Sequence, residues 1–408
     1  MKRNLIKLYY FFRSKTFAKY VVTTILLAIL FIGFGLLLHF GMGSDVEVTV
    51  VGSAFGFAAS NIIIYALGIF SRMFEDKIKV NTSTKDIFQV YKNPNYKKIV
   101  KLNDSECTIC YNDVLINNNC KFEVDDNPNK DFILDGFFEQ NFIQLYEAHS
   151  SSSKENVKTI RLDDIEKIND KEYILHLSRS NYFNHLVTNR VIDFPLSNGL
   201  TVRTFCEYGP NINELKNSKL SNHIGINALV FFDDEKEGKH ILFPQRKKDS
   251  TISKNGITAS IASRLLFPKG KETISKQFLF NDCIYDFLEK RLDLNLSILG
   301  KENIIINFLG IGQKIYEGGK PKMYFSVFLK GINLSNYQSV LNDCNHDSSN
   351  IDKDKKVHVA KLSKSIFIKN GALMKIDSYN FKKNKYHTYK LVPERSLIAN
   401  IWHYTQSK

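Results

Sequence analysis

The chain contains little cysteine, proline or tryptophan: its 408 residues include 6 Cys, 8 Pro and 1 Trp. Six cysteines are too few for a secreted domain of this size that is held together by disulfides. The low proline content, together with 21 Gly, excludes collagen-like and proline-rich chains. Apolar residues make up 43% of the chain, which excludes a disordered protein and predicts two or three packed units.

The cysteine spacing gives no complete metal site. Cys107 and Cys110 form a single CxxC, and Cys120 follows ten residues later. A structural zinc site usually needs two close pairs of ligands, and the sequence has no second CxxC and no HxxxH. We therefore expect reduced thiols with structural roles, and no metal or other cofactor.

The charge is strongly positive, with 56 basic and 42 acidic residues giving a formal net charge of +14. Residues 72–408 carry +10 of this excess. A basic domain attracts anions such as nucleotides, nucleic acid or anionic lipid. Only 11 of the 56 basic residues are Arg, and a Lys-rich composition also arises from genome base bias, so charge alone does not identify the ligand.

Two long apolar runs lie near the N-terminus, at residues 20–40 and 48–71. A helix of the first length spans about 31 Å, which matches the hydrocarbon core of a bilayer. Residues 41–47 between them contain two acidic and no basic residues. The pattern predicts a transmembrane hairpin over residues 1–74, and the second run makes a cleaved signal peptide a poor alternative.

Basic residues flank both apolar runs on their outer sides, which predicts that both termini are cytoplasmic. In the second run Gly52 and Gly56 form a GxxxG pair, and Asn61 is a polar group at membrane depth. Small residues of this kind allow helices to approach closely and to oligomerise. Simple packing of the two helices within one chain remains the alternative.

The rest of the chain divides into a connector at 75–92, a strand-rich region at 93–220 and a domain at 221–408. In the strand-rich region we expect strands at 97–103, 107–116 and 141–148, and a helix that begins within 162–168. The last domain shows a tighter pattern of apolar runs and turns. Its expected elements are a hairpin of strands at 224–232 and 241–246, a helix at 274–294, strands at 304–311 and 323–330, and a helix at 392–404.

This order of elements resembles a NUDIX domain over about residues 220–400. The hairpin ends in Gln245 and Arg246, a Gly-containing loop precedes the 274–294 helix, and the run MYFSVFLK begins at Met323. The resemblance implies an α/β/α sandwich with a mixed sheet.

The catalytic box of that family is degenerate in this chain. NUDIX hydrolases carry a Gly, a Glu and then Arg-Glu-hydrophobic-x-Glu-Glu, whose carboxylates hold Mg²⁺. Alignment on the helix places Gln277 at the first Glu, Tyr285 at the Arg and Lys290 at the last Glu. Asp286 and Glu289 remain as residual metal candidates. We expect no catalysis, because a lysine at the last position opposes metal binding.

The acidic residues of this helix still lie on one face, since Asp282, Asp286, Glu289 and Asp293 are spaced at i, i+4, i+7 and i+11. Such a row can gather a divalent ion, and it can equally be the solvated face of an amphipathic helix.

Two spans followed by such a domain resemble the two-transmembrane NUDIX effectors of bacterial cyclic-oligonucleotide antiphage (CBASS) systems. The matching sequence includes 173–196 and 200–203 as well as the run that begins SNHIGIN at Ser221. The resemblance implies that the cytosolic domain binds a cyclic oligonucleotide made by a partner nucleotidyltransferase, and no nucleic acid polymer. The membrane helices then oligomerise and disrupt the bacterial inner membrane, which kills the cell.

The ligand-binding residues expected in this interpretation are basic and aromatic. They are Arg246, Lys247, Lys248 and Arg264 for phosphates, Tyr316 and Tyr324 for stacking on bases, and Asn189 and Arg203 from the matching stretch. Two other functions remain open. One is a membrane-anchored, Mg²⁺-dependent NUDIX hydrolase of nucleoside diphosphate derivatives, and the other is an anchored scaffold for a protein partner.

Overall fold

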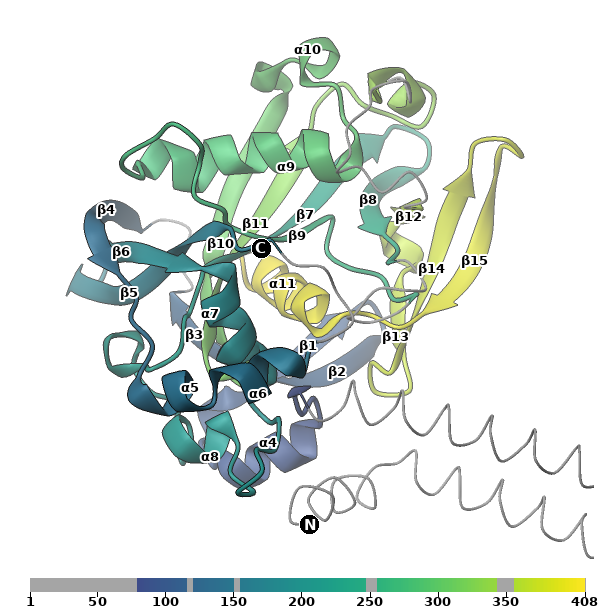
Figure 1. Ribbon diagram of the computed structural model, residues 1–408. Coiled ribbons are helices and arrows are strands. Elements are labelled where there is room, and N and C mark those ends of the chain that lie inside the picture. Colours follow the sequence, from purple (N-terminus) through teal and green to yellow (C-terminus); the bar gives the residue numbers. More distant parts are fainter. Residues whose placement is uncertain (1–78, 116–119, 150–154, 247–254, 343–355, 408) are drawn as a thin grey trace, which may run out of the picture.

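The computed structural model describes residues 79–115, 120–149, 155–246, 255–342 and 356–407, which form a mixed α and β structure around one large sheet (Figure 1). The ten strands of this sheet are β3 (Asn112–Leu115), β7 (Gly225–Asp234), β8 (Gly238–Pro244), β9 (Ile261–Arg264), β10 (Ile304–Lys314), β11 (Lys320–Leu329), β12 (Val357–Lys361), β13 (Ile366–Ile368), β14 (Leu373–Asn380) and β15 (Lys385–Leu391). Eight follow the order β13-β14-β12-β8-β7-β11-β10-β3, while β15 pairs with β14 and β9 pairs with β7.

The centre of the sheet is the β7–β8 hairpin and the β10–β11 pair. β7 runs parallel to β11 and antiparallel to β8 and β9, and β10 runs antiparallel to β11. The predicted hairpin and the two predicted strands that flank Gly318 and Gly319 are therefore confirmed. The strand predicted at 304–311 continues to Lys314, so its last residues, Gln313 and Lys314, are polar and lie at one end of the sheet.

Two helices cover opposite faces of this sheet. Helix α9 (Cys283–Leu292), extended at its N-terminal side by the π-helical turn Phe278–Asp282, packs its Leu288 into the same cluster as Val230 of β7. Helix α11 (Arg395–Gln406) packs Leu397 into the cluster that contains Leu229. Alternate residues of a strand point to opposite faces, so the middle of β7, from Ala228 to Phe232, is apolar on both faces. Both predicted helices, at 274–294 and 392–404, are confirmed.

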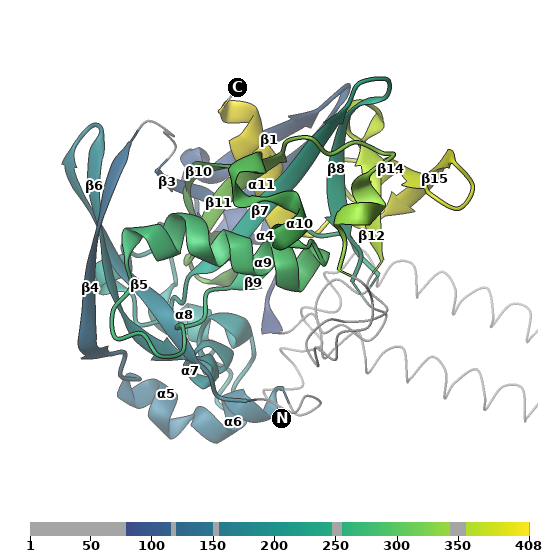
Figure 2. The same cartoon turned by 90° about the horizontal axis from the view of Figure 1, so that it is seen from above.

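Smaller elements surround the sheet. A three-stranded sheet has the order β4-β6-β5, and β1 pairs with β2. Both views place this three-stranded sheet and the β14–β15 hairpin at opposite sides of the molecule (Figure 2). The bounds are β1 (Lys97–Leu102), β2 (Ser105–Cys110), β4 (Lys121–Asp131), β5 (Lys158–Asn169), β6 (Glu172–Asn181), α4 (Thr84–Val90), α5 (Gly136–Gln140), α6 (Phe142–Glu147), α7 (Tyr182–Val187), α8 (Val202–Cys206) and α10 (Leu296–Leu299).

Two predictions of secondary structure are wrong. The strand expected at 141–148 is helix α6, in which Phe142, Leu145 and Tyr146 have helical spacing and pack on one side. The helix expected to begin within 162–168 is part of β5, which pairs with β6 along its length. A register shift after Leu162 interrupts the two-residue period of this strand, so the sequence does not show a regular strand pattern there.

The predicted spans at 20–40 and 48–71, with Gly52, Gly56 and Asn61, lie outside the described residues. Within residues 79–407, gaps excepted, no helix is both long enough and apolar enough to cross a membrane.

Candidate functional site

A pocket of about 250 Å³ lies at one end of the large sheet. β7 and β11 begin at this end, and β8, β9 and β10 finish there, because each is antiparallel to β7 or β11. The described side chains that line it include seven basic groups, two carboxylates and two histidines. These are Arg190, Arg246, Arg264, Arg291, Lys314, Lys320, Lys322, Glu317, Glu394, His185 and His223.

Glu317 lies at the centre of one cationic cluster. Its carboxylate oxygens are 2.7 Å from Lys314 Nζ, 3.7 Å from an Arg190 nitrogen and 3.9 Å from Lys320 Nζ. Burial alone would raise the pKa of Glu317, but these cations outweigh it and hold the pKa far below its usual value. Glu317 is therefore ionised, and it offsets only part of the surrounding positive charge.

Lys320 and Lys322 are buried lysines of β11 whose side chains lie on the same face of the strand. Burial lowers the pKa of Lys320 to about 7 and that of Lys322 to about 8. Lys322 Nζ donates to Asn227 Oδ1 at 3.1 Å. Its aliphatic stem lies across Gly225, where an added Cβ would come within 2.9 Å of the Lys322 Cγ. The pKa values of these two lysines therefore lie close to neutral pH.

Arg246 lies at the end of β8 and forms an ion pair of 2.9 Å with buried Glu394, which precedes α11. Burial would raise the pKa of Glu394, but Arg246 and Lys322 outweigh it and lower the pKa. Arg246 retains about a quarter of its exposure and lines the pocket. Its guanidinium therefore has donors beyond the two nitrogens that contact Glu394.

Several nitrogens of the pocket are buried without a hydrogen-bond partner among the described residues. They are Nε of Arg264, Nδ1 of His185 and both ring nitrogens of His223. The Arg264 guanidinium stacks over the ring of Tyr182, with its central carbon 4.2 Å from the ring centroid. Stacking fixes the direction of the guanidinium and leaves its edge for a ligand.

This arrangement is suited to binding an anion. Positive side chains at a partly desolvated site attract phosphate strongly, and Arg and Lys are its usual partners. The same cations oppose a divalent metal ion. Among the described residues no group of three or more His, Cys, Asp or Glu side chains is placed to hold a metal.

The structure brings two of the predicted ligand residues, Arg246 and Arg264, to this pocket. Lys247 and Lys248 lie outside the described residues. Tyr324 is not brought to the pocket, because it is buried on the α11 face of the sheet and stacks on His403 with ring centroids 4.6 Å apart.

Tyr316 is also buried, and its hydroxyl contacts Thr84 Oγ1 at 3.0 Å and accepts hydrogen bonds from Cys110 N at 3.0 Å and Arg395 at 3.1 Å. Its ring lies under the Arg395 guanidinium, 4.6 Å from the central carbon. Tyr316 is therefore part of the packing between α4, β2 and α11 and does not line the pocket.

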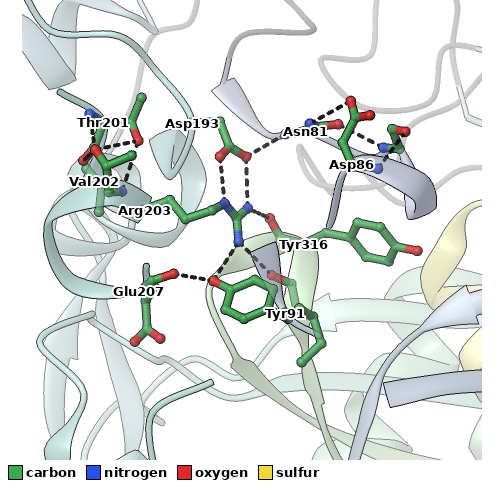
Figure 3. A network of polar contacts seen from close by, with 12 residues as sticks. Asn81, Asp86, Tyr91, Asp193, Thr201, Val202, Arg203, Glu207 and Tyr316 are labelled. Carbon is green, nitrogen blue, oxygen red and sulfur yellow. Dashed lines mark hydrogen bonds and ion pairs between the residues drawn. The ribbon is translucent and has the colours of Figure 1, made fainter. Parts of the chain in front are cut away.

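Arg203 lies behind the pocket, in a buried polar network (Figure 3). It donates to both carboxylate oxygens of Asp193 at 2.6 and 2.8 Å. It also donates to the carbonyls of Ile315 and Tyr316 at 3.1 and 2.9 Å and to Tyr91 Oη at 3.0 Å. Arg203 therefore holds the turn Ile315–Glu317, which carries Glu317 into the pocket.

Asn189 supports the same turn from another side. Its side-chain nitrogen donates to the Glu317 carbonyl at 2.9 Å and to Asn222 Oδ1 at 3.0 Å. Asn189 is fully buried, and neither Asn189 nor Arg203 lines the pocket. Both predicted residues thus position the wall of the site.

The acidic residues of the 274–294 helix lie elsewhere. Asp286 and Glu289 are exposed on α9, and Asp286 forms an ion pair of 2.5 Å with Lys290. Neither lines the pocket, whereas Arg291 of the same helix does, with a hydrogen bond to Ser263 Oγ at 3.3 Å. The end of α9 thus contributes a cation to the site.

The CxxC cysteines are buried free thiols of β2. Cys107 packs in the cluster with α11, and Cys110 packs in the cluster with α4 and α8, so the two side chains leave the strand in different directions. Burial raises the pKa of each thiol to about 12. Cys120 is partly buried and lies in the segment that leads into β4.

Sequence reasoning missed most of the pocket. The missed residues are Arg190, Arg291, Lys314, Lys320, Lys322, Glu317, Glu394, His185 and His223. One signal was present: Lys320 and Lys322 alternate at the start of an apolar strand that is buried along its length. Two lysines on one face of a buried strand indicate a partner of opposite charge. No protein-family model matches the chain, and no curated protein matches it.

Proposed function

We propose that this chain is a receptor for a cyclic oligonucleotide and acts as a membrane effector of an antiphage defence system. The observation that carries the proposal is the basic pocket, whose seven cationic side chains exceed its two carboxylates. Phosphodiesters keep one negative charge each at neutral pH, so a ring of nucleotides presents several anionic groups to such a surface. The volume of about 250 Å³ lies just below the range of about 300–1,000 Å³ typical of ligand sites. The pocket therefore holds one part of the ring, and the rest lies across its mouth.

The arrangement of elements supports a NUDIX-like domain for the C-terminal part. A mixed sheet lies between α9 and α11. In the proposal, α9 corresponds to the helix that carries the catalytic acids in that family. In this chain the pocket receives Arg291 from α9, while Asp286 and Glu289 remain on its exposed face. A pocket that receives a cation from this helix, and no carboxylate, favours binding of a phosphate group over metal-assisted hydrolysis.

A route from the pocket to the N-terminal segment supports the effector part of the proposal. Asp193, which holds Arg203, also accepts a hydrogen bond of 2.6 Å from the backbone nitrogen of Asn81 (Figure 3). Asn81 lies in the connector at 75–92, which follows the predicted membrane hairpin in the chain. A ligand that binds the cations around Glu317 thus acts on the turn Ile315–Glu317, and Arg203 links this turn to the connector through Asp193. In the proposal, receptor domains that associate on the ligand raise the local concentration of the hairpins, which then oligomerise and disrupt the bacterial inner membrane.

The test is thermal unfolding of the purified full-length chain in detergent, with cyclic di- and trinucleotides and their linear forms, without Mg²⁺. A ligand that binds only the folded state raises the unfolding temperature. We expect one ring to raise it and the matching linear form to have little effect. No shift with any ring would refute the receptor function and leave the anchored scaffold in its place.

A matched pair of variants on α9 separates the pocket from general charge. Arg291→Gln removes a pocket cation, and Lys290→Gln removes the neighbouring cation, which does not line the pocket. Loss of one charge-assisted hydrogen bond to phosphate, about 1.5–3 kcal/mol, weakens binding about tenfold or more. We expect this loss in Arg291→Gln and affinity within about twofold of the unchanged chain in Lys290→Gln. Equal effects in the two variants would argue against the pocket as the binding site.

A further inference from the structure

Two histidines lie side by side in the lining of the basic pocket. His185 belongs to α7, and His223 lies just before β7. Their ring centroids are 3.9 Å apart, and the residues are 5% and 1% exposed. Nδ1 of His185 and both ring nitrogens of His223 have no hydrogen-bond partner in the part of the chain that the structure describes. Since buried polar atoms in native proteins nearly always have partners, these open nitrogens point to a ligand.

A histidine elsewhere in the fold shows the usual arrangement. His240 of β8 is as buried as His223. One of its ring nitrogens contacts the Gly238 carbonyl at 2.7 Å, and the other contacts the Tyr386 hydroxyl at 2.8 Å. His358 and His403 are equally buried away from the pocket, and each leaves only Nδ1 without a partner. His223 differs from these described histidines because both of its ring nitrogens are open.

Charged and titratable groups face the two rings from several elements. They are His149, Tyr182, Arg190, Arg264, Glu317 and Lys320. Lys320 Nζ is 3.5 Å from Nε2 of His185. Burial first, and then these neighbouring cations, lower the pKa of both histidines well below the usual value, so the empty pocket holds neutral rings. A neutral imidazole has one donor and one acceptor nitrogen.

We propose that His185 and His223 are direct ligand contacts and that an anionic ligand binds to them together with at least one proton. This inference rests on the proposed function for the class of ligand. A phosphate oxygen accepts a hydrogen bond from a ring N–H. Its negative charge also offsets the repulsion from Lys320, Arg190 and Arg264, which lets an open ring nitrogen take a proton from solvent. Affinity for the anion then rises as the pH falls.

The test measures proton uptake on binding by the full-length chain in detergent. The probes are inorganic sulfate and a cyclic dinucleotide, because neither changes its charge between about pH 6 and about pH 8. Calorimetry in buffers of different ionisation enthalpy counts the protons taken up. His223→Gln keeps a polar, hydrogen-bonding side chain that cannot become charged, and His240→Gln is the control for loss of a buried histidine.

We expect His223→Gln to bind within about threefold of the unchanged chain at about pH 8 and up to about a hundredfold more weakly at about pH 6, which is the change for one proton over two units of pH. Its proton uptake falls, while that of His240→Gln does not. Lys320 is present in the unchanged chain and in both variants, so a difference in proton uptake between them is due to the imidazole of His223. Binding with equal proton uptake in His223→Gln would overturn this inference and leave the receptor function intact. Failure of both probes to bind at any pH would overturn both.

Discussion

Arg203 gives the sharpest test of how the wall of the pocket is held. Its guanidinium is 4% exposed and makes five hydrogen bonds of 2.6–3.1 Å, two of them to the carboxylate of Asp193. Arg203→Met keeps much of the side-chain volume and removes all five. Asp193 is then left buried with the hydrogen bond from Asn81 N as its remaining contact from this network.

Removal of one partner from a buried ion pair typically costs about 3–5 kcal/mol, because the other charge stays buried without compensation. That loss is a large part of the about 5–15 kcal/mol of a whole domain. We therefore expect Arg203→Met to lower the free energy of unfolding by about 3–5 kcal/mol. The pocket turn Ile315–Glu317 also loses two hydrogen bonds to its carbonyls, so anion affinity falls together with stability.

The assay is urea unfolding of the full-length chain followed by tryptophan fluorescence. Trp402 is the single tryptophan of the sequence and is buried in α11, so it reports on the described domain. Lys290→Met is the control, since its ion pair with Asp286 is exposed and such pairs contribute about 0–1 kcal/mol. The double variant Arg203→Met with Asp193→Asn should lose less than the sum of the single losses. A loss below about 1 kcal/mol for Arg203→Met would refute the reasoning.

Three further predictions concern the pocket and the core. Burial lowers the pKa of Lys320 from 10.5 to about 7, so above about pH 7 the unfolded chain binds more protons than the folded chain, and the free energy of unfolding rises with pH. Lys320→Met should reduce the slope of this free energy against pH by up to about 1.4 kcal/mol per pH unit. Urea titrations between about pH 7 and about pH 9 measure the slope. Gly312→Ala places a methyl group against the buried Tyr111 side chain and should cost at least about 1–3 kcal/mol in the same assay. Leu288→Ala, on the buried face of α9, should cost about 2–5 kcal/mol, and a loss under about 1 kcal/mol would contradict its place in the core.

Local patterns in the sequence were sufficient for the central elements of the fold. The β7–β8 hairpin, β10, β11, α9 and α11 were all predicted, because the strands are short apolar runs bounded by turns and the helices repeat their apolar residues at helical spacing. α6 and β5 were assigned to the wrong class, because the packing of α6 and the pairing of β5 with β6 decided their structure against the local pattern. The predicted membrane hairpin and the resemblance to NUDIX effectors stay predictions.

The sequence by itself determined that the chain is basic, that its cysteines form no paired metal motif and that its central strands are buried. Only the tertiary structure decided where the charge gathers. The cations of the pocket come from segments as far apart in the sequence as Arg190 and Lys322. The parallel pairing of β7 with β11 places the first residues of these two strands at the same end of the sheet, where the pocket lies. The spacing of residues in the sequence does not predict these contacts, since contacts between distant segments depend on strand order and direction. Arg246 and Arg264 were predicted as basic side chains of the last domain that could pair with phosphates. His185, His223 and the lysines of β11 became visible as a site only once the sheet was assembled.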